Sequence, residues 1–122
     1  MEQAYIVSGV RTAIGKFGGA LKDIEAVDLG AIVVREALLR AGLDGAQVDE
    51  VILGNVFQAG NKGNPARQAA IKAGMPVEVP AMTINKQCAS GMRAFSIASG
   101  LIKGEDLGVA VVGGLESMTR VP

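Results

Sequence analysis

The sequence predicts an α/β domain with a mostly parallel sheet, in the order βαβαβαβ. Short apolar runs of strand length alternate along the whole chain with longer segments of helical periodicity. This alternation is typical of parallel strands, because each parallel pair needs a crossover connection. The 122 residues suffice for one domain, and with 49% hydrophobic but only 3% aromatic residues its core must be aliphatic.

The first half of the chain is expected to supply two strands with a helix between them. Residues 4–7 form a short apolar run that predicts the first strand, and residues 51–56 predict the second. Asp28 can cap the intervening helix, which Gly42 ends. The apolar periodicity of this helix predicts the face that packs on the sheet: Leu29, Ile32, Val33, Ala37 and Leu38.

The second half repeats the pattern after a polar, glycine-rich loop. Asn64 can cap a helix that has Pro65 at its first position. The third strand is expected at 81–85 and the fourth at 107–112, and the chain then leaves the sheet through a glycine-rich turn at 113–118.

The helix between the last two strands, residues 89–103, is apolar on nearly every side. Arg93 is its only charge before the end, and a helix that is apolar all round is a buried helix. The sheet can cover only one face of it. We therefore expect a partner for the second face, either another subunit or a further part of the same polypeptide.

Composition and charge exclude several classes of function. Twelve basic and twelve acidic side chains cancel, so no nucleic-acid or membrane partner is expected, and no apolar run reaches membrane-spanning length. With one cysteine and no histidine, neither an internal disulfide nor a zinc site is expected. Residues 1–5 lack the basic and apolar regions of an export signal, which with the single cysteine predicts a cytoplasmic location.

Cys88, the only cysteine, stands where the third strand gives way to the helix at 89–103, and two interpretations of it stay open. A free cysteine usually packs as a small apolar group. At a helix N-terminus, however, unpaired N–H groups favour the thiolate and could hold a developing oxyanion on an attacked carbonyl. The small residues at 89–91 leave room for an acyl group.

The general base that an acyl-transfer thiol normally needs is missing, because the chain has no histidine. Glu116 could act as an acid or base, or it could be a turn or interface residue. Lys86 could add positive charge beside the sulfur, or it could simply be solvated. The residues by themselves thus leave both a catalytic and a structural Cys88 open.

Four segments of the chain resemble thiolases in sequence, order and spacing. Residues 85–94, NKQCASGMRA, closely resemble the active-site cysteine signature of that family. The other three are RTAIG at 11–15, GNPARQAA at 63–70 and GGLESM at 113–118. A single short motif is weak, whereas four collinear motifs are strong. The resemblance implies a thiolase-like layered α/β fold, of which this chain is the incomplete N-terminal half.

The resemblance also implies a function, acetyl-CoA C-acetyltransferase activity. Cys88 matches the nucleophile, which would form an acyl-cysteine while the enzyme makes or cleaves acetoacetyl-CoA. Acetyl-CoA and acetoacetyl-CoA are then substrates, and no separate cofactor or metal is implied. Two alternatives are a non-catalytic dimerising module with a structural cysteine, and a condensing enzyme of the ketoacyl synthase kind.

By this resemblance, residues 1–117 are the N-terminal core domain without its last strand, and residues 118–122 begin a loop region. The family's activating histidine and its second cysteine would lie beyond Pro122, in the remainder of the thiolase chain. We therefore expect this chain to be inactive when taken alone.

The resemblance places the third strand at an edge of the sheet, where thiolases pair across a twofold axis. Such pairing would satisfy backbone groups that an exposed edge leaves open. We expect a homodimer contact there, with residues 61–67 nearby, unless a loop merely covers the edge. The contact residues would be Met82, Thr83, Ile84 and Asn85.

Overall fold

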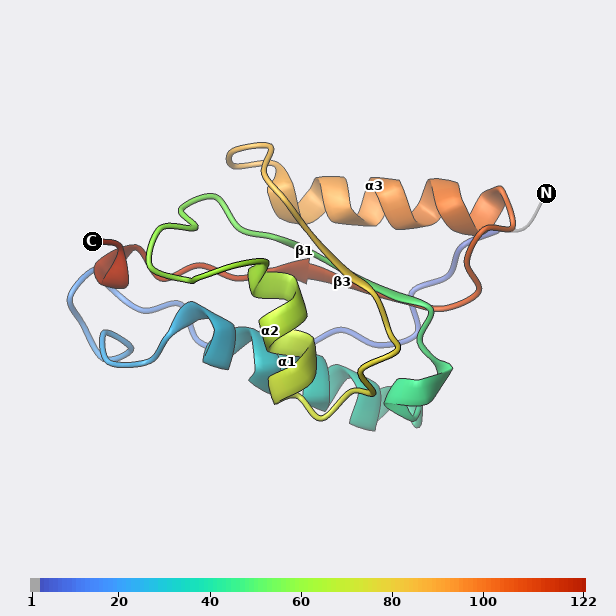
Figure 1. Cartoon of the computed structure of the whole chain (residues 1–122), viewed down its shortest axis with the longest axis horizontal. Helices are drawn as coiled ribbons and strands as arrows, with labels where there is room; N and C mark the ends of the chain where they lie inside the picture. The colour runs from blue at the N-terminus through green and yellow to red at the C-terminus, as the bar shows by residue number, and fades with distance from the viewer. Residues whose placement is uncertain (1–2) are drawn as a thin grey trace.

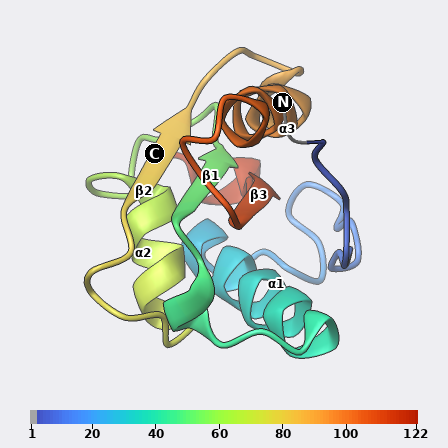
Figure 2. The same ribbon diagram turned by 90° about the vertical axis from the view of Figure 1, so that its right-hand side faces the viewer.

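The computed structural model describes residues 3–122 and has three layers (Figures 1 and 2). Helices α1 and α2 cover one face of the sheet, and α3 covers the other. Met1 and Glu2 lie outside the described residues. They belong to the segment 1–5, for which no export signal was expected. The elements are α1 (Ala26–Ala41), β1 (Glu50–Gly54), α2 (Pro65–Lys72), β2 (Ala81–Ile84), α3 (Ser90–Lys103) and β3 (Ala110–Gly114), with short 3-10 turns at Gly45–Gln47 and Met118–Arg120.

The sheet has three parallel strands in the order β2-β1-β3, so β1 is central. Ile52 of β1 is in register with Met82 of β2. Side chains alternate along β1: Val51 and Leu53 belong to the core under α1 and α2, whereas Ile52 packs with Ala98 of α3. The prediction of a parallel α/β sheet is confirmed, with three strands in the described residues.

Helix α1 begins earlier than predicted, and the prediction that Asp28 is its N-cap is wrong. Glu25 occupies the N-cap position and makes no side-chain capping bond. Asp28 lies in the first turn, where a negative charge suits the helix dipole, and its carboxylate pairs with Lys72 Nζ of α2 at 2.7 Å. Gly42 ends the helix as predicted, with a left-handed φ of 69°.

The predicted inner face of α1 is wrong in part. Leu38 is buried as expected and Leu29, Val33 and Ala37 are half-buried, but Ile32 is 49% exposed. The helix packs on α2 through small residues, since a Cβ on Gly30 would lie 3.1 Å from the Cβ of Ala69. Close approach of two helices selects small side chains at the contact, which a search for large apolar residues overlooks. The buried residues are Ala26, Val27, Gly30, Ala31, Val34 and Leu38.

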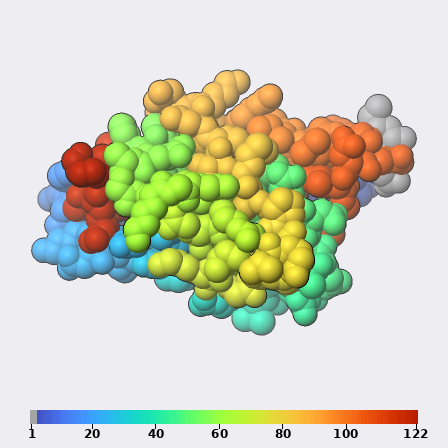
Figure 3. Space-filling view, viewed as in Figure 1, coloured from blue at the N-terminus to red at the C-terminus, as the bar shows by residue number. Residues whose placement is uncertain are grey.

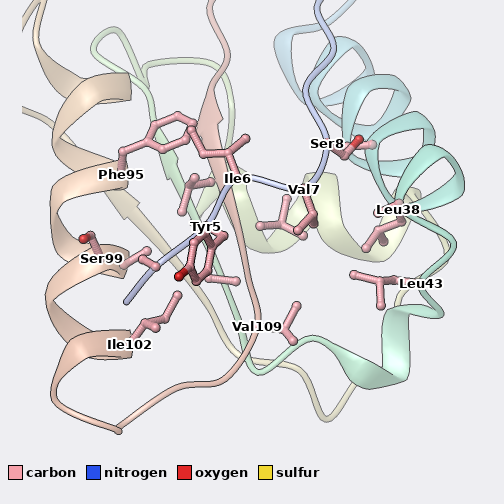
Figure 4. A pocket seen from close by; sticks show the side chains of 17 residues that line it. Tyr5, Ile6, Val7, Ser8, Leu38, Leu43, Phe95, Ser99, Ile102 and Val109 are labelled. Atoms are coloured by element: carbon pink, nitrogen blue, oxygen red, sulfur yellow. The ribbon is translucent and has the colours of Figure 1, made fainter. Parts of the chain in front are cut away.

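Residues 4–7 do not form the predicted first strand, so that prediction is wrong in this structure. The segment runs past the side of β3 that faces away from β1 (Figures 2 and 4), and Tyr5, Ile6 and Val7 are 75%, 76% and 72% exposed. A cavity of about 310 Å³, here called the N-terminal slot, is lined by this segment together with α1, α3 and β3. A strand forms only where a neighbour's backbone groups are within reach, and the segment has no such neighbour among residues 3–122.

Strand β3 begins and ends later than the predicted range of 107–112. The Asp49 carboxylate accepts hydrogen bonds from the N–H groups of Gly108 and Val109 at 2.7 and 3.0 Å, so a side chain holds these residues just before the strand begins. Gly113 and Gly114, predicted to start a turn, pair with β1 instead. Of the two, Gly114 lies beside the start of α3, since a Cβ on it would stand 3.8 Å from the Gly91 Cα.

The remaining elements are confirmed to within two residues of their predicted bounds. Asn64 caps α2 by accepting the N–H of Arg67, and Pro65 occupies the first position. The second face of α3 is uncovered within the described residues, where Met92 is 77% and Phe95 42% exposed. No helix among residues 3–122 is long and apolar enough to cross a membrane.

Candidate active site

An open cavity of about 360 Å³ lies where the three parallel strands end. Parallel sheets commonly bind ligands at the carboxyl ends of their strands. The turn that follows β2 projects at this end of the molecule, at the start of α3 (Figure 1). We call the hollow the Cys88 cavity, and residues that end or follow each of the three strands line it: Gly54, Val56, Gln87, Cys88, Ser90, Gly91, Gly114, Leu115 and Glu116.

Cys88 is exposed in the turn between β2 and α3. It directly precedes Ala89, the N-cap of α3. Cys88 therefore lies just before the helix and not in its first turn. A cysteine that only fills space is typically buried among apolar side chains. The exposure of Cys88 therefore favours the interpretation in which the thiol meets a ligand.

Ser90 holds the turn around Cys88 closed. Its buried hydroxyl donates to the Gln87 carbonyl at 2.6 Å and accepts the Lys86 N–H at 2.7 Å. On the other side, the Asn85 side-chain oxygen accepts the Gln87 N–H at 3.0 Å. Gln87 has a left-handed φ of 51°, which is costly for any residue but glycine and persists only where surrounding contacts enforce it.

Two of the N–H groups that could have stabilised an oxyanion are already engaged. The Ala89 N–H donates to the Lys86 carbonyl at 3.1 Å, and the Ser90 N–H donates to the Gln87 carbonyl at 3.0 Å. These bonds shape the turn and leave neither group free to serve an acyl oxygen. The start of α3 therefore offers two fewer N–H donors for an oxyanion than the sequence suggested.

Glycines bring the start of α3 directly over the strand ends. A Cβ on Gly54 would stand 2.6 Å from the Cβ of Ser90 and 2.9 Å from the Gly91 nitrogen, closer than side chains can approach. A Cβ on Gly114 would meet the Gly54 carbonyl oxygen at 3.4 Å, an ordinary contact distance. The absence of a side chain at Gly54 is therefore what lets the start of α3, and with it the Cys88 turn, lie this close to the sheet.

Glu116, which could have been an acid, a base or a turn residue, anchors the loop that follows β1. Its carboxylate accepts the N–H groups of Val56 and Phe57 at 2.9 and 3.1 Å and the Asn55 Nδ2 at 3.2 Å. Asn55 is buried and also donates to the Leu115 carbonyl at 3.0 Å. All three donors come from the protein itself, which favours a structural role for the carboxylate.

Lys86 is exposed, and its side chain forms no ion pair with the residues that the structure describes. No group of three or more His, Cys, Asp or Glu side chains within 3–122 could hold a metal ion. Sequence reasoning missed Ser90 and Asn55 as positioning groups. The signal for Asn55 was available, since an amide directly after the apolar run 51–54 must find buried partners.

Strand β2 lies at an edge of the sheet as predicted, and its segment is open to solvent on the face seen in Figure 3. The carbonyls of Pro80 and Ile84 accept the N–H groups of Val51 in β1 and of Asn55 just after it, so the intervening residues 81 and 83 turn their backbone groups outward. Asn64 covers part of this edge, because its Nδ2 donates to the Ala81 carbonyl at 3.0 Å. The homodimer contact at this edge stays a prediction.

Comparison with known proteins gives consistent matches over the whole chain. Residues 4–122 match the family described as the thiolase N-terminal domain. The chain is 54% identical to an acetyl-CoA acetyltransferase of Cupriavidus necator and 53% identical to one of Pseudomonas aeruginosa, in both cases over all of this chain and 31% of the relative. It superposes on the crystal structure of the Bacillus anthracis acetyl-CoA acetyltransferase with a TM-score of 0.96 and 43% identity, over 100% of this chain and 31% of that one. The chain thus spans about a third of the length of these relatives.

Proposed function

This chain belongs to the thiolase family, and we propose that it carries the nucleophile, Cys88, of an acetyl-CoA C-acetyltransferase. The placement of Cys88 supports this most directly: the thiol is exposed, in a braced turn, beside an open cavity at the carboxyl ends of three strands. Relatives over 50% identical across this whole chain bear the name acetyl-CoA acetyltransferase. The match to thiolases leaves the ketoacyl synthase alternative without support.

The proposed reaction has two steps. The Cys88 thiolate attacks the carbonyl carbon of acetyl-CoA, a C–S bond forms, and CoA leaves as a thiolate that takes up a proton. A second acetyl-CoA then loses a proton from its α-carbon, and that carbon attacks the acetyl-cysteine. Acetoacetyl-CoA is released and the Cys88 thiolate is restored. The reverse sequence, with free CoA, cleaves acetoacetyl-CoA.

The two proton transfers need groups that the 122 residues do not supply. The sequence has no histidine, and among residues 3–122 the one carboxylate that lines the Cys88 cavity, that of Glu116, already accepts hydrogen bonds from three protein donors. We therefore propose that these residues alone do not turn over, and that the remainder of a thiolase chain supplies the acid and base. The cytoplasmic location stays a prediction.

We further propose that an additional strand fills the N-terminal slot. Residues 4–7 are extended and unpaired on one side of it, and β3 lies on the other. Ser8 is one of the residues that line the slot (Figure 4), and its hydroxyl is buried without a hydrogen-bond partner among residues 3–122. A strand placed here would pair with both neighbours and would cover the exposed side chains of Tyr5, Ile6 and Val7.

A non-catalytic dimerising module is the second candidate, because β2 is an open edge and two amides near Cys88 are already engaged. Thiolysis of acetoacetyl-CoA by free CoA separates the two candidates. We expect turnover when the rest of the thiolase polypeptide is supplied, none by the 122 residues alone, and none by a Cys88→Ala variant. Turnover by Cys88→Ala at the wild-type rate would refute the proposed function.

A further inference from the structure

A continuous line of hydrogen bonds joins Glu116 to the turn that carries Cys88. Glu116 accepts the Val56 N–H at 2.9 Å, and the carbonyl of the same Val56 accepts the Asn85 Nδ2 at 3.3 Å. The Asn85 oxygen then accepts the Gln87 N–H at 3.0 Å. Each link is a separate donor–acceptor pair, and together they cross from the end of β3, past the end of β1, to the end of β2.

The geometry points to Glu116 and Asn85 as positioning residues for Cys88. Glu116 fixes the Val56 peptide, Val56 holds the Asn85 amide, and Asn85 holds Gln87 in the left-handed conformation that precedes Cys88. The inference rests on the proposed function of Cys88 as a nucleophile. Neither residue needs to touch the substrate, because both act on the direction in which the sulfur points.

The hydrogen bonds of Glu116 to the loop after β1 are the strongest part of this line. The Glu116 carboxylate takes two successive backbone N–H groups and the buried Asn55 amide, and hydrogen bonds to a charged acceptor are stronger than neutral ones. Asn85 is the weak point, since it is exposed and its bond to Val56 is long. The Gln87 conformation is costly by itself, so loss of either anchor should let the turn relax.

Asp49 provides a matched control for Glu116. It also accepts two successive backbone N–H groups with a carboxylate, those of Gly108 and Val109, but at the opposite end of β3. Truncating it removes the same kind of interaction without touching the Cys88 turn. A general effect on stability should therefore appear in both variants, and an effect on Cys88 only in one.

The test compares Glu116→Ala, Asn85→Ala, the double variant and Asp49→Ala, each checked for folding by circular dichroism. The first readout is the amide NMR signal of Gln87 in the 122-residue chain, which reports its hydrogen bond to Asn85. The second is the rate at which acetyl-CoA acetylates Cys88, measured with the rest of the thiolase polypeptide supplied. Glu116→Gln, which keeps one acceptor oxygen, serves as the conservative rescue and as a second variant should Glu116→Ala fail to fold.

We expect Glu116→Ala and Asn85→Ala to shift the Gln87 signal in the same direction. Each should slow acetylation about tenfold, because either substitution breaks one link of the line that holds Gln87. The double variant should be no slower than the slower single variant, because both residues act along one line. Glu116→Gln should recover part of the rate, and Asp49→Ala should leave both readouts unchanged.

An unshifted Gln87 signal in Glu116→Ala would overturn the inference, as would additive losses in the double variant or an equal effect of Asp49→Ala. If the wild-type protein forms no acetyl-cysteine at all, the proposed function fails, while the Gln87 signal still decides whether Glu116 and Asn85 hold the turn.

Discussion

The α-carbon of Gly54 and the side chain of Ser90 stand so close that a Cβ on Gly54 would lie 2.6 Å from the Cβ of Ser90. Through this contact the first turn of α3 packs on the end of β1. The Ser90 hydroxyl also holds together, by two hydrogen bonds, the loop that carries Cys88. The position of the thiol therefore depends on a glycine in a different element.

Gly54→Ala should destabilise the chain by about 1–3 kcal/mol, the usual cost of forcing extra volume into a packed contact. The new methyl group meets Ser90 and the backbone of Gly91, and neither can move without displacing α3. Urea unfolding checks this prediction. Gly100→Ala is the matched control within α3: nothing lies within 4 Å of its added Cβ, so it should raise stability by about 0.5–1 kcal/mol. Equal effects of the two substitutions would contradict the account.

Ser90→Ala should lower the free energy of unfolding by about 1–3 kcal/mol, because it leaves the Lys86 N–H and the Gln87 carbonyl without their side-chain partner. It should also change the rate at which iodoacetamide alkylates Cys88, the only thiol, as measured by intact mass. Ser96→Ala, at an exposed position of the same helix, serves as the control and should alter neither value. An unchanged alkylation rate in Ser90→Ala would argue that the hydroxyl does not shape the turn.

Asp49 should make the stability of the chain depend on pH. Hydrogen bonds from the backbone of Val109 and then Gly108 lower the pKa of Asp49 below its ordinary value of 3.8. A group whose pKa is lowered by folding stabilises the folded state fully above its unfolded pKa. That contribution should be lost as the pH falls from 3.8 through the lowered pKa of the folded state.

Urea midpoints of wild type and Asp49→Ala, measured near neutral pH and again well below pH 3.8, check this prediction. The two proteins should differ in stability near neutral pH and converge in acid, because a protonated carboxyl no longer offers the charged acceptor. A constant difference across the whole range would show that the side chain acts through packing alone.

Thr83→Pro should abolish pairing of β2 across a twofold axis. Thr83 turns its backbone outward, so proline removes the N–H that a partner strand would use while the ladder to β1 stays intact. Sedimentation should show a dimer for the wild type and a monomer for Thr83→Pro. Thr83→Val loses the hydroxyl that donates to Asn64 and accepts the Ala66 N–H but keeps the backbone N–H, so it should remain dimeric. A monomeric wild type would remove the dimer contact from the account.

The sequence predicted most of the elements because local signals agree with the final structure. Pro65 after Asn64 marked the start of α2, and Gly42 marked the end of α1. Strand β1 could be predicted because its side chains are buried on both faces. The signature around Cys88 likewise predicted the position of the thiol, between a strand and a helix, to within two residues of the observed α3.

The errors came from interactions between distant residues. The start of β3 depends on Asp49, about 60 positions earlier, and Gly113 belongs to the strand because it pairs with Leu53 of β1. Residues 4–7 have the apolar pattern of a strand but meet no strand edge in the described residues. The role of Glu116 depends on the loop after β1, which no local pattern reveals.

Intact-mass analysis of the protein after incubation with acetyl-CoA tests the central claim most directly. With the rest of the thiolase polypeptide supplied, we predict one acetyl group on this chain, which peptide mapping assigns to Cys88 and which is absent from Cys88→Ala. Addition of free CoA should remove it. An unmodified chain, or an acetyl group that persists in Cys88→Ala, would contradict the assignment of Cys88 as the nucleophile.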